Sequence, residues 1–334
     1  MKITFFCKVD KEALSIVEFY KQDIEILKEL GHEVHIATSY KEISWSSDLI
    51  FVWWWTYAFF PVFLGKILRK PVIITGTFNY YAPESPIDFF RRPLWQRLLI
   101  KYAIKNATHN ILVSKNEFDL ISNDWKLKNI SYSPHVVDTQ KYVPAEKNFH
   151  EKYIFSIIWT GKTNLLRKCL PEIIESAEEV LKKEKNLKFI IAGRKGDGFE
   201  FVQSLIESKK LTEKVVLLGE ISEEEKIKYL QNCLIYLQPS KYEGFGLAVA
   251  EAMSCGAPVI TTDVGEVENV VGEAGILLSG YDPTEITEAI FKLLNSESYR
   301  FELGQKARAR ILNNFGQDVR KKDIKKIIQI INKK

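Results

Sequence analysis

Two glutamates eight residues apart form the densest chemical signal in the sequence. Glu243 and Glu251 stand in "EGFGLAVAE", a loop with two glycines followed by a helix-like run. If the step between them is mostly helical, their α-carbons lie about 8 to 12 Å apart at 1.5 Å rise per residue. That distance is similar to the span from a sugar to a ribose across a diphosphate. One carboxylate can therefore accept hydrogen bonds from a sugar and the other from a ribose.

The loop between the glutamates has the features of a phosphate-binding turn. The helix after it is predicted to run from about Leu247 to Ser254, with Gly256 as its C-terminal glycine. Backbone N–H groups at a helix start, together with the helix dipole, suit a phosphate. The expected donors belong to Gly244, Phe245, Gly246 and Leu247. Such a turn is also common in α/β proteins without a ligand, so a purely structural interpretation stays open at this point.

Short β-branched or aromatic runs alternate with longer amphipathic runs along the chain. The first half holds "KITFFC", a helix-like stretch from Leu14 to Leu30, "EVHIAT", "DLIFVWW", "PVIIT" and "HNILVS". The second half holds "YIFSIIW", "LKFIIAG", "KVVLLG", "CLIYLQPS", "APVITT" and "GILLS". Strand, helix, strand in series is typical of a doubly wound parallel sheet. The sequence therefore predicts an α/β protein with two Rossmann-like domains in tandem.

The predicted linker between the domains is "SPHVVDTQKYVPAEKN", residues 133–148, because it has two prolines and little periodicity. We assign residues 1–145 to the first domain and residues 146–315 to the second. The terminal helix, about residues 316–334, is amphipathic and basic. It is either a solvated helix or a segment that packs back onto the first domain.

Composition is typical of an ordinary globular protein. The 334 residues are 46% hydrophobic and 27% charged, and the net charge of +4 is too small to indicate nucleic acid as a partner. The four cysteines lie far apart and have no histidines at ligand spacing, which indicates reduced thiols and no zinc site. The apolar run in "MKITFFCKVDKE" is too short for a signal peptide. We therefore expect a cytoplasmic protein.

The two-glutamate segment resembles a known family signature. "YEGFGLAVAEAMSCGAPVI", followed by "GEVENVVGEAGILL", resembles the donor site of family 4 retaining glycosyltransferases of the GT-B fold. The resemblance is strong over about residues 130–320, whereas the chain before that fits by layout more than by motif. It implies two Rossmann-like domains whose parallel sheets face a central cleft. The second domain would bind a nucleotide-sugar donor.

The resemblance extends upstream and implies roles for two lysines. In "WTGKTNLLRKCL", Gly161 precedes Lys162 at the family's arginine position, and Lys168 takes the position of the family's lysine. In the family these cations neutralise the diphosphate leaving group, which gains negative charge as the glycosidic bond breaks. Without the two glutamates, a pair of lysines on a solvated loop would be the better interpretation. Backbone atoms near Ile221, in "LLGEIS", are expected to meet the nucleobase.

The chain departs from the family pattern at several positions in and near its first half. His135 stands where asparagine is usual, and no glycine occurs around Leu14 and Ser15, where many members have a glycine pair near the donor phosphates. A bulkier loop admits a ligand less closely. Asn79 replaces a histidine that points into the active site. Asparagine can donate a hydrogen bond to a sugar hydroxyl but cannot titrate near neutrality.

The resemblance implies a hexosyltransferase-like enzyme that moves a sugar to an acceptor with retention of anomeric configuration. Glu243 is better placed to orient the sugar than to attack it, and the leaving phosphate helps to deprotonate the acceptor hydroxyl. The sequence has no Asp-x-Asp motif to hold a metal beside a diphosphate. We therefore expect no metal and no cofactor, with Lys162, Lys168 and the loop amides supplying the positive field.

Two other functions stay open. Because the glycine pair and the histidine are missing, one is a non-catalytic or altered-function GT-B module that binds a nucleotide-sugar. The other, among enzymes, is another GT-B member such as a nucleotide-sugar epimerase. A dinucleotide oxidoreductase is disfavoured, since no G-x-G-x-x-G follows the first strand.

A basic, aromatic stretch in the first half indicates a membrane surface as a partner. In "FFRRPLWQRLLIKYAIK", residues 89–105, five basic residues alternate with large apolar ones, and such a stretch can lie on an anionic bilayer. The alternative is a helix that packs one face on its own sheet and solvates the basic residues. The two interpretations are compatible. With a membrane, the acceptor would be a lipid-linked saccharide or a glycolipid, and the protein would attach peripherally to the inner face of the cell membrane.

The aromatic run "FVWWWTYAFF", residues 51–60, must be tested as a transmembrane helix. From Leu49 to Gly65 there are 17 uncharged residues, which only reaches the lower limit of about 17 to 25 for a span. Pro61 falls in the second half of this segment. A span is therefore disfavoured.

The run instead predicts a buried strand followed by a helix. Its continuous apolar character fits a strand from Leu49 to about Trp53, covered on both faces, and a helix from Phe59 to Leu68. Trp54 and Trp55 then fall near the carboxyl end of the strand. With Asn79, they are the acceptor-side candidates, where rings could stack on a sugar or hold a lipid.

Overall fold

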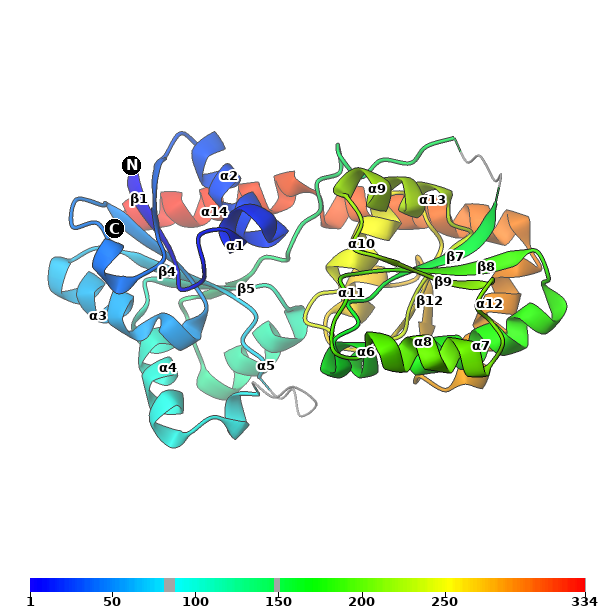
Figure 1. The fold of residues 1–334 in the computed structure, drawn as a ribbon. Helices are drawn as coiled ribbons and strands as arrows, with labels where there is room; N and C mark the ends of the chain where they lie inside the picture. The colour runs from blue at the N-terminus through cyan, green and yellow to red at the C-terminus, as the bar shows by residue number, and fades with distance from the viewer. Residues whose placement is uncertain (81–87, 147–150, 334) are drawn as a thin grey trace. The chain divides into compact units, whose positions relative to one another are not determined.

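The structure is a computed structural model, which describes residues 1–80, 88–146 and 151–333. Its contacts divide the chain into two compact units (Figure 1). Unit 1 consists of Met1–Val136 and Gln317–Lys334, and unit 2 consists of Val137–Gly316. The expected boundary at residues 145 and 146 falls within unit 2. Residues 147 and 148 of the predicted linker, and residue 334 of the predicted terminal helix, lie outside the described residues.

Unit 1 is built on a parallel sheet. Its described strands are ordered β2-β1-β3-β4-β5-β6, with bounds β1 Lys2–Cys7, β2 Glu33–Ala37, β3 Leu49–Trp53, β4 Val72–Gly76, β5 His109–Leu112 and β6 Ile130–Tyr132. The α-helices of the unit are α1 Ala13–Ile16, α2 Glu18–Glu29, α3 Phe59–Leu68, α4 Leu94–Asn106, α5 Lys115–Trp125 and α14 Gln317–Asn332. Short 3-10 helices are η1 Tyr40–Glu42, η2 Trp55–Tyr57 and η3 Phe89–Arg91.

Helices cover both faces of this sheet, which explains why its strands are apolar throughout. One face packs against α3, α4 and α5 around residues such as Val52 and Ile74. The other packs against α2 and α14 around Phe5, Phe51 and Trp53. Within the described residues, no helix is both long and apolar enough to cross a membrane.

The strand and helix predicted from the aromatic run are confirmed as β3 and α3. The helix predicted from Leu14 to Leu30 is wrong in one respect, because the backbone is extended at Val17 and separates α1 from α2. Residues 89–105 likewise do not form one helix. Arg92, which follows η3 and precedes a proline, is extended, and α4 begins only after Pro93. Strand β6 was not predicted, because it has only three residues at the edge of the sheet.

Unit 2 repeats the same arrangement with a different strand order. Its described strands are ordered β12-β11-β10-β7-β8-β9 and are all parallel, with bounds β7 Lys152–Ile157, β8 Leu187–Ala192, β9 Val215–Gly219, β10 Ile235–Gln238, β11 Val259–Thr262 and β12 Ile276–Leu278. Its helices are α6 Lys162–Arg167, α7 Leu170–Lys183, α8 Phe199–Ser208, α9 Glu223–Asn232, α10 Leu247–Ser254, α11 Val267–Val271, α12 Pro283–Leu294 and α13 Glu297–Asn314. Helices α7, α8 and α12 pack on one face, and α9, α10 and α11 on the other (Figure 1).

Each sheet has one place where the direction of strand addition reverses. In unit 1 the chain adds β2 on one side of β1 and β3 on the other, and in unit 2 it adds β8 and β10 on opposite sides of β7. Loops after the two central strands then leave in opposite directions and open a crevice at the carboxyl ends of the strands. The crevices are expected beyond Cys7 and Trp53 in unit 1, and beyond Ile157 and Gln238 in unit 2.

Helix α14 belongs to the core of unit 1, although it follows unit 2 in the sequence. Ile324, Ile327 and Ile328 are buried among residues of β1, β3 and α2. Arg320 is 1% exposed; its Nε donates to Asp23 Oδ1 at 2.5 Å and its Nη2 donates to Asp23 Oδ2 at 2.8 Å. A bidentate, buried pair of this kind fixes both the position and the rotation of the helix.

Replacing Arg320 with methionine is expected to lower the free energy of unfolding by about 3–5 kcal/mol, because Asp23 would stay buried without its cation. Chemical denaturation followed by tryptophan fluorescence measures this change. Lys321→Met is the matched control, since Lys321 is the next residue of α14 and pairs with Glu29 at the surface. We expect it to leave the denaturation midpoint unchanged. Equal effects of the two substitutions would contradict the assignment.

Candidate active site

The carboxyl ends of β7 and β10 lie side by side at the strand-order reversal of unit 2. The loop after β7 leads through Gly161 into α6, and the loop after β10 leads through Glu243 into α10. Ligands of open α/β sheets bind in the crevice at this place. The two sequence segments that carry the predicted donor-site residues are therefore neighbours because of the strand order.

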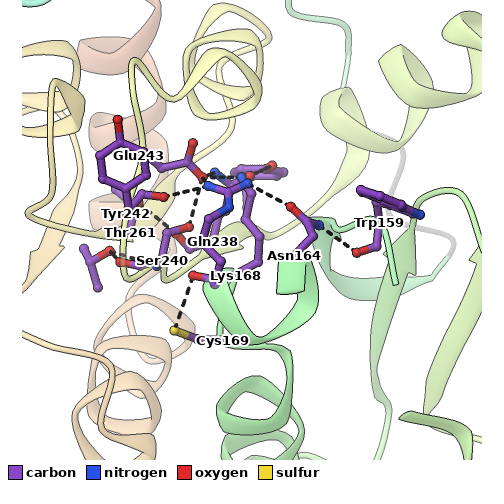
Figure 2. Close-up of polar contacts among 12 residues, drawn as sticks. Trp159, Asn164, Lys168, Cys169, Gln238, Ser240, Tyr242, Glu243 and Thr261 are labelled. Carbon is purple, nitrogen blue, oxygen red and sulfur yellow. Dashed lines mark hydrogen bonds and ion pairs between the residues drawn. The ribbon is translucent and has the colours of Figure 1, made fainter. Parts of the chain in front are cut away.

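Glu243 lies at the centre of a polar cluster formed by these loops (Figure 2). Its Oε1 forms an ion pair with Lys168 Nζ and a second with Arg167 Nη1 at 3.1 Å. The same oxygen accepts from Ser240 Oγ at 3.1 Å and from Gln238 Nε2 at 3.5 Å. Two predicted residues, Glu243 and Lys168, are thus in direct contact.

The electrostatics of the cluster keep Glu243 ionised. Its burial alone would raise the pKa of this carboxyl, but Lys168 and Arg167 outweigh that effect and lower the pKa. All four contacts fall on Oε1, and among the described residues nothing donates to Oε2. Oε2 therefore keeps its capacity to accept a hydrogen bond, and its direction is set by the contacts of Oε1.

Hydrogen bonds between strands hold the β10 loop in place. Thr262 Oγ1 donates to the Ser240 carbonyl at 2.6 Å and accepts from the Ser240 N–H at 2.9 Å. Thr261 Oγ1 donates to the Gln238 carbonyl at 2.8 Å. Gly265 also packs on this loop, since a Cβ at its position would lie 1.9 Å from the Glu243 carbonyl oxygen. The backbone that carries Glu243 is therefore fixed by β11 and the turn after it.

Lys162, the other predicted lysine, has no ion pair with Glu243 within the described residues, unlike Lys168. It is the first residue of α6, its side chain is exposed, and its N–H donates to Asp197 Oδ1 at 2.8 Å. Gly161, before it, is buried. Arg167, which the sequence analysis did not single out, is the second cation on Glu243. Its Nη1 also donates to the Tyr242 carbonyl at 2.6 Å, so it links the two loops. Its place directly before Lys168 in "LLRKC" was the available signal.

The predicted helix after the glycine loop is confirmed as α10, Leu247–Ser254. Gly246 precedes it with φ of 83°, a left-handed conformation that glycine adopts without strain. The first helical N–H bond runs from Ala250 to the Gly246 carbonyl. In the part of the chain that the structure describes, the N–H groups of Leu247 to Val249 have no acceptor, which makes them donors for an anion. Gly244 and Phe245 complete the loop, with Phe245 buried against Phe315.

Glu251 lies in a second polar cluster on α10. Its Oε1 accepts from Tyr142 Oη at 3.0 Å, and its Oε2 pairs with Lys226 Nζ at 3.1 Å. Glu223 contacts the same tyrosine and lysine. Burial raises the pKa of Glu251, and Lys226 offsets only part of this effect. Ile221, expected near the nucleobase, is half-buried at the entrance to α9. No local sequence pattern could have identified the cluster around Glu251, because Tyr142 and Lys226 are distant from Glu251 in sequence.

The acceptor-side candidates lie together in unit 1. Trp54, Trp55 and Asn79 line one cavity of about 580 Å³ beyond the carboxyl ends of β1, β3 and β4. Trp55 is 2% exposed and its Nε1 donates to Asn110 Oδ1 at 3.1 Å, so most of this ring belongs to the core. Trp54 is half-buried and has a left-handed backbone with φ of 78°. Leu14, where the family glycine pair is missing, is buried in the core of unit 1.

Within the described ranges, no group of three histidine, cysteine, aspartate or glutamate side chains could hold a metal ion. The cations near Glu243 are instead lysine and arginine side chains.

Comparisons with known proteins agree with this arrangement. A family model described as "Glycosyl transferases group 1" matches residues 158–310. The capsular polysaccharide biosynthesis glycosyltransferase CapM of Staphylococcus aureus is 31% identical, and the alignment covers 91% of this chain and 87% of CapM. Among solved structures, HepE of Anabaena in complex with UDP has a TM-score of 0.80 at 15% identity, covering 98% of this chain and 100% of HepE. Sucrose-phosphate synthase of Thermosynechococcus elongatus has a TM-score of 0.77 at 16% identity and covers 99% of both chains.

The extent of the match to CapM shows the family, and the structural similarities show the fold. The two units, each built on a six-stranded parallel sheet within the described residues, agree with that fold. The chain belongs to the glycosyl transferases group 1 family and has the GT-B fold.

Proposed function

We propose that this glycosyltransferase moves a sugar from a nucleotide-sugar to an acceptor hydroxyl with retention of anomeric configuration. The observation that carries the proposal is the one-sided contact of Glu243. Its Oε1 has four partners, whereas its Oε2 has no donor in the described part of the chain. An ionised acceptor with a fixed orientation suits a hydroxyl of the donor sugar.

The groups around Glu243 suit the departure of a diphosphate. The bond from the anomeric carbon to the diphosphate oxygen breaks, and a bond to the acceptor oxygen forms on the same face. The acceptor proton passes to the departing diphosphate. Lys168 and the N–H groups at the start of α10 supply a positive field for the charge that develops on that group. Glu243 is a poor nucleophile here, because Lys168 and Arg167 stabilise its negative charge and lower its pKa. Its proposed role is to orient the sugar.

Lys162 and Arg167 are proposed as further contacts of the diphosphate. Lys162 is exposed at the start of α6, and Arg167 is half-buried beside Lys168. The proposed transfer needs no metal, since these side chains and the loop amides supply the positive charge. Glu251 is proposed to accept from the ribose, with Tyr142 and Lys226 as its neighbours, and backbone atoms near Ile221 to meet the base. UDP is the first nucleotide to test, because HepE was solved with UDP.

The acceptor is proposed to be a saccharide held at a membrane, as the name of CapM associates that relative with capsular polysaccharide. Helices α3 and α4 pack together and expose large apolar side chains. We call this the α3/α4 face, defined by Phe60, Phe63, Ile67, Leu94, Trp95 and Leu98. Lys66 and Lys105 are exposed on the same helices. Apolar side chains flanked by lysines fit the surface of an anionic bilayer on the cytoplasmic side.

A thermal-shift screen tests the donor site. Among UDP, GDP, ADP and dTDP, we expect one nucleotide to raise the melting temperature, since a ligand at about 100 times its Kd stabilises the native state by roughly 2.7 kcal/mol. The same shift is expected in EDTA if no metal takes part. A screen in which no nucleoside diphosphate changes the melting temperature would rule out the proposed donor site.

Lys168→Ala is expected to lower kcat/KM by about 10²–10³-fold, the loss typical of a donor to a developing negative charge. The assay for kcat/KM measures release of the nucleotide from a panel of nucleotide-sugars, with and without an acceptor extract. The wild-type rate is expected to be unchanged in EDTA. Lys241→Ala is the matched control, because Lys241 lies in the same loop as Glu243 but pairs with Glu172. Near-normal turnover of the Lys168 variant would contradict its role. Proton NMR of the product tests retention.

The double substitution Trp95→Ser and Leu98→Ser is expected to abolish most flotation with vesicles that contain phosphatidylglycerol. Each side chain would contribute up to roughly 1.5–3 kcal/mol when it leaves water, and both are exposed, so the fold is kept. Leu120→Ser, at an exposed position of α5, is the control. Equal recovery of the wild type with neutral and anionic vesicles would count against the membrane surface.

A further inference from the structure

The cavity of unit 1 lies at the strand-order reversal of its sheet. It opens beyond β1 and β3, the adjacent strands at which the direction of strand addition reverses. Its lining includes Lys8, which follows β1, and Trp54, which follows β3. It therefore occupies in unit 1 the same topological place that the Glu243 cluster occupies in unit 2. Open α/β sheets bind their ligands in this crevice.

The charged residues in the described lining of this cavity are all basic: Lys8, Arg91 and Arg92. Arg92 is half-buried; its Nη1 donates to Thr56 Oγ1 at 3.0 Å, and its Nε is buried without an acceptor among the described residues. Lys8 Nζ lies 5.0 Å from the centre of the Tyr57 ring. A buried guanidinium donor without an acceptor is costly, and an anionic ligand would supply one.

Acidic groups do not neutralise the described lining. Asp88 is the described carboxylate that acts on Arg92 electrostatically. It is buried and its Oδ1 accepts from the Phe90 N–H at 2.8 Å. Arg91 is exposed, and its side chain has no ion pair within the described residues. The described lining thus contains three basic side chains and no carboxylate.

The rest of the wall is aromatic and apolar. Trp54 and Phe78 face the cavity together with Ile100 of α4. Gly76 leaves room for Trp54, since a Cβ there would lie 3.1 Å from the ring. Aromatic faces combined with a few charged donors suit a ligand that has both an apolar or sugar body and an anionic group.

From the position of the cavity and its unpaired basic donors, we infer that it binds the phosphate of a phosphorylated acceptor, next to the sugar or lipid body that contacts Trp54. This inference rests on the proposed function, because it names the chemical class of the acceptor. Guanidinium groups match phosphate oxygens bidentately. The phosphate could belong to a lipid-borne saccharide or to a soluble sugar phosphate, and both share this chemistry.

The test measures binding of soluble probes to the full chain by tryptophan fluorescence. Octyl phosphate and octyl glucoside are compared below their micelle concentrations. Octyl phosphate is expected to bind more tightly by about tenfold or more at low salt and to weaken as salt rises. Arg91→Gln and Arg92→Gln are each expected to weaken octyl phosphate by about tenfold and to leave octyl glucoside unchanged.

Lys128→Gln is the matched control, because it removes one exposed charge of unit 1 outside the cavity. Since Arg92 also holds Thr56, Arg91→Gln is the variant that separates binding from folding. Glucose 1-phosphate distinguishes the sources: tighter binding of octyl phosphate indicates a lipid-borne phosphate, and tighter binding of glucose 1-phosphate indicates a soluble one.

Three results would overturn the inference: equal affinity for the two octyl probes, wild-type affinity of Arg91→Gln for octyl phosphate, or displacement of octyl phosphate by the nucleotide that gives the thermal shift. The last would show that the cavity serves the donor. If none of the four nucleoside diphosphates shifts the melting temperature of the wild type, the proposed function fails instead, and the octyl phosphate measurement still reports on the cavity. The two failures are therefore distinguishable.

Discussion

A carboxylate that is buried away from water needs cations or hydrogen-bond donors to stabilise its charge. In unit 2 this requirement falls on the Glu243 carboxylate. It is compensated by Lys168 and Arg167, which lie at the end of α6, and by Ser240 on its own loop. The loops meet because β7 and β10 are adjacent, although the residues of β8, β9 and the helices between them separate the strands in sequence. The order of the strands is thus as much a part of the site as the charged groups.

The same constraint explains the rigidity of the loop. A buried ionic cluster stabilises a structure only when its geometry is fixed and its remaining hydrogen-bonding atoms have partners. Thr261 and Thr262 of β11 hold the backbone of the β10 loop, and Gly265 packs against the carbonyl of Glu243. The β10 loop, strand β11 and the turn at Gly265 therefore fix together the backbone from which the Glu243 side chain extends.

Local sequence patterns predicted most helices and strands well. They failed where a single residue interrupts a run with helical periodicity. The bounds of β3, α3 and α10 follow from apolar runs and from Gly246, but the break at Val17 and the start of α4 after Pro93 depend on backbone angles. For the candidate site, Glu243, Lys168 and Glu251 were predicted through a motif. Tyr142 and Lys226 were not, because they meet Glu251 through tertiary packing between segments that share no pattern. Arg167 was missed although it stands directly before Lys168 in the sequence.

The pairing of Arg320 with Asp23 has a consequence for how the chain is synthesised. The two residues are 297 positions apart, and the ribosome releases all of unit 2, which is continuous, between them. Domains usually fold in the order of their synthesis, the N-terminal one first. Until α14 is synthesised, Asp23 lacks its cation, and the face of the first sheet that α14 covers is protected by α2 alone. The later part of the nascent chain can complete its fold first, and the earlier part is the one that needs protection from aggregation.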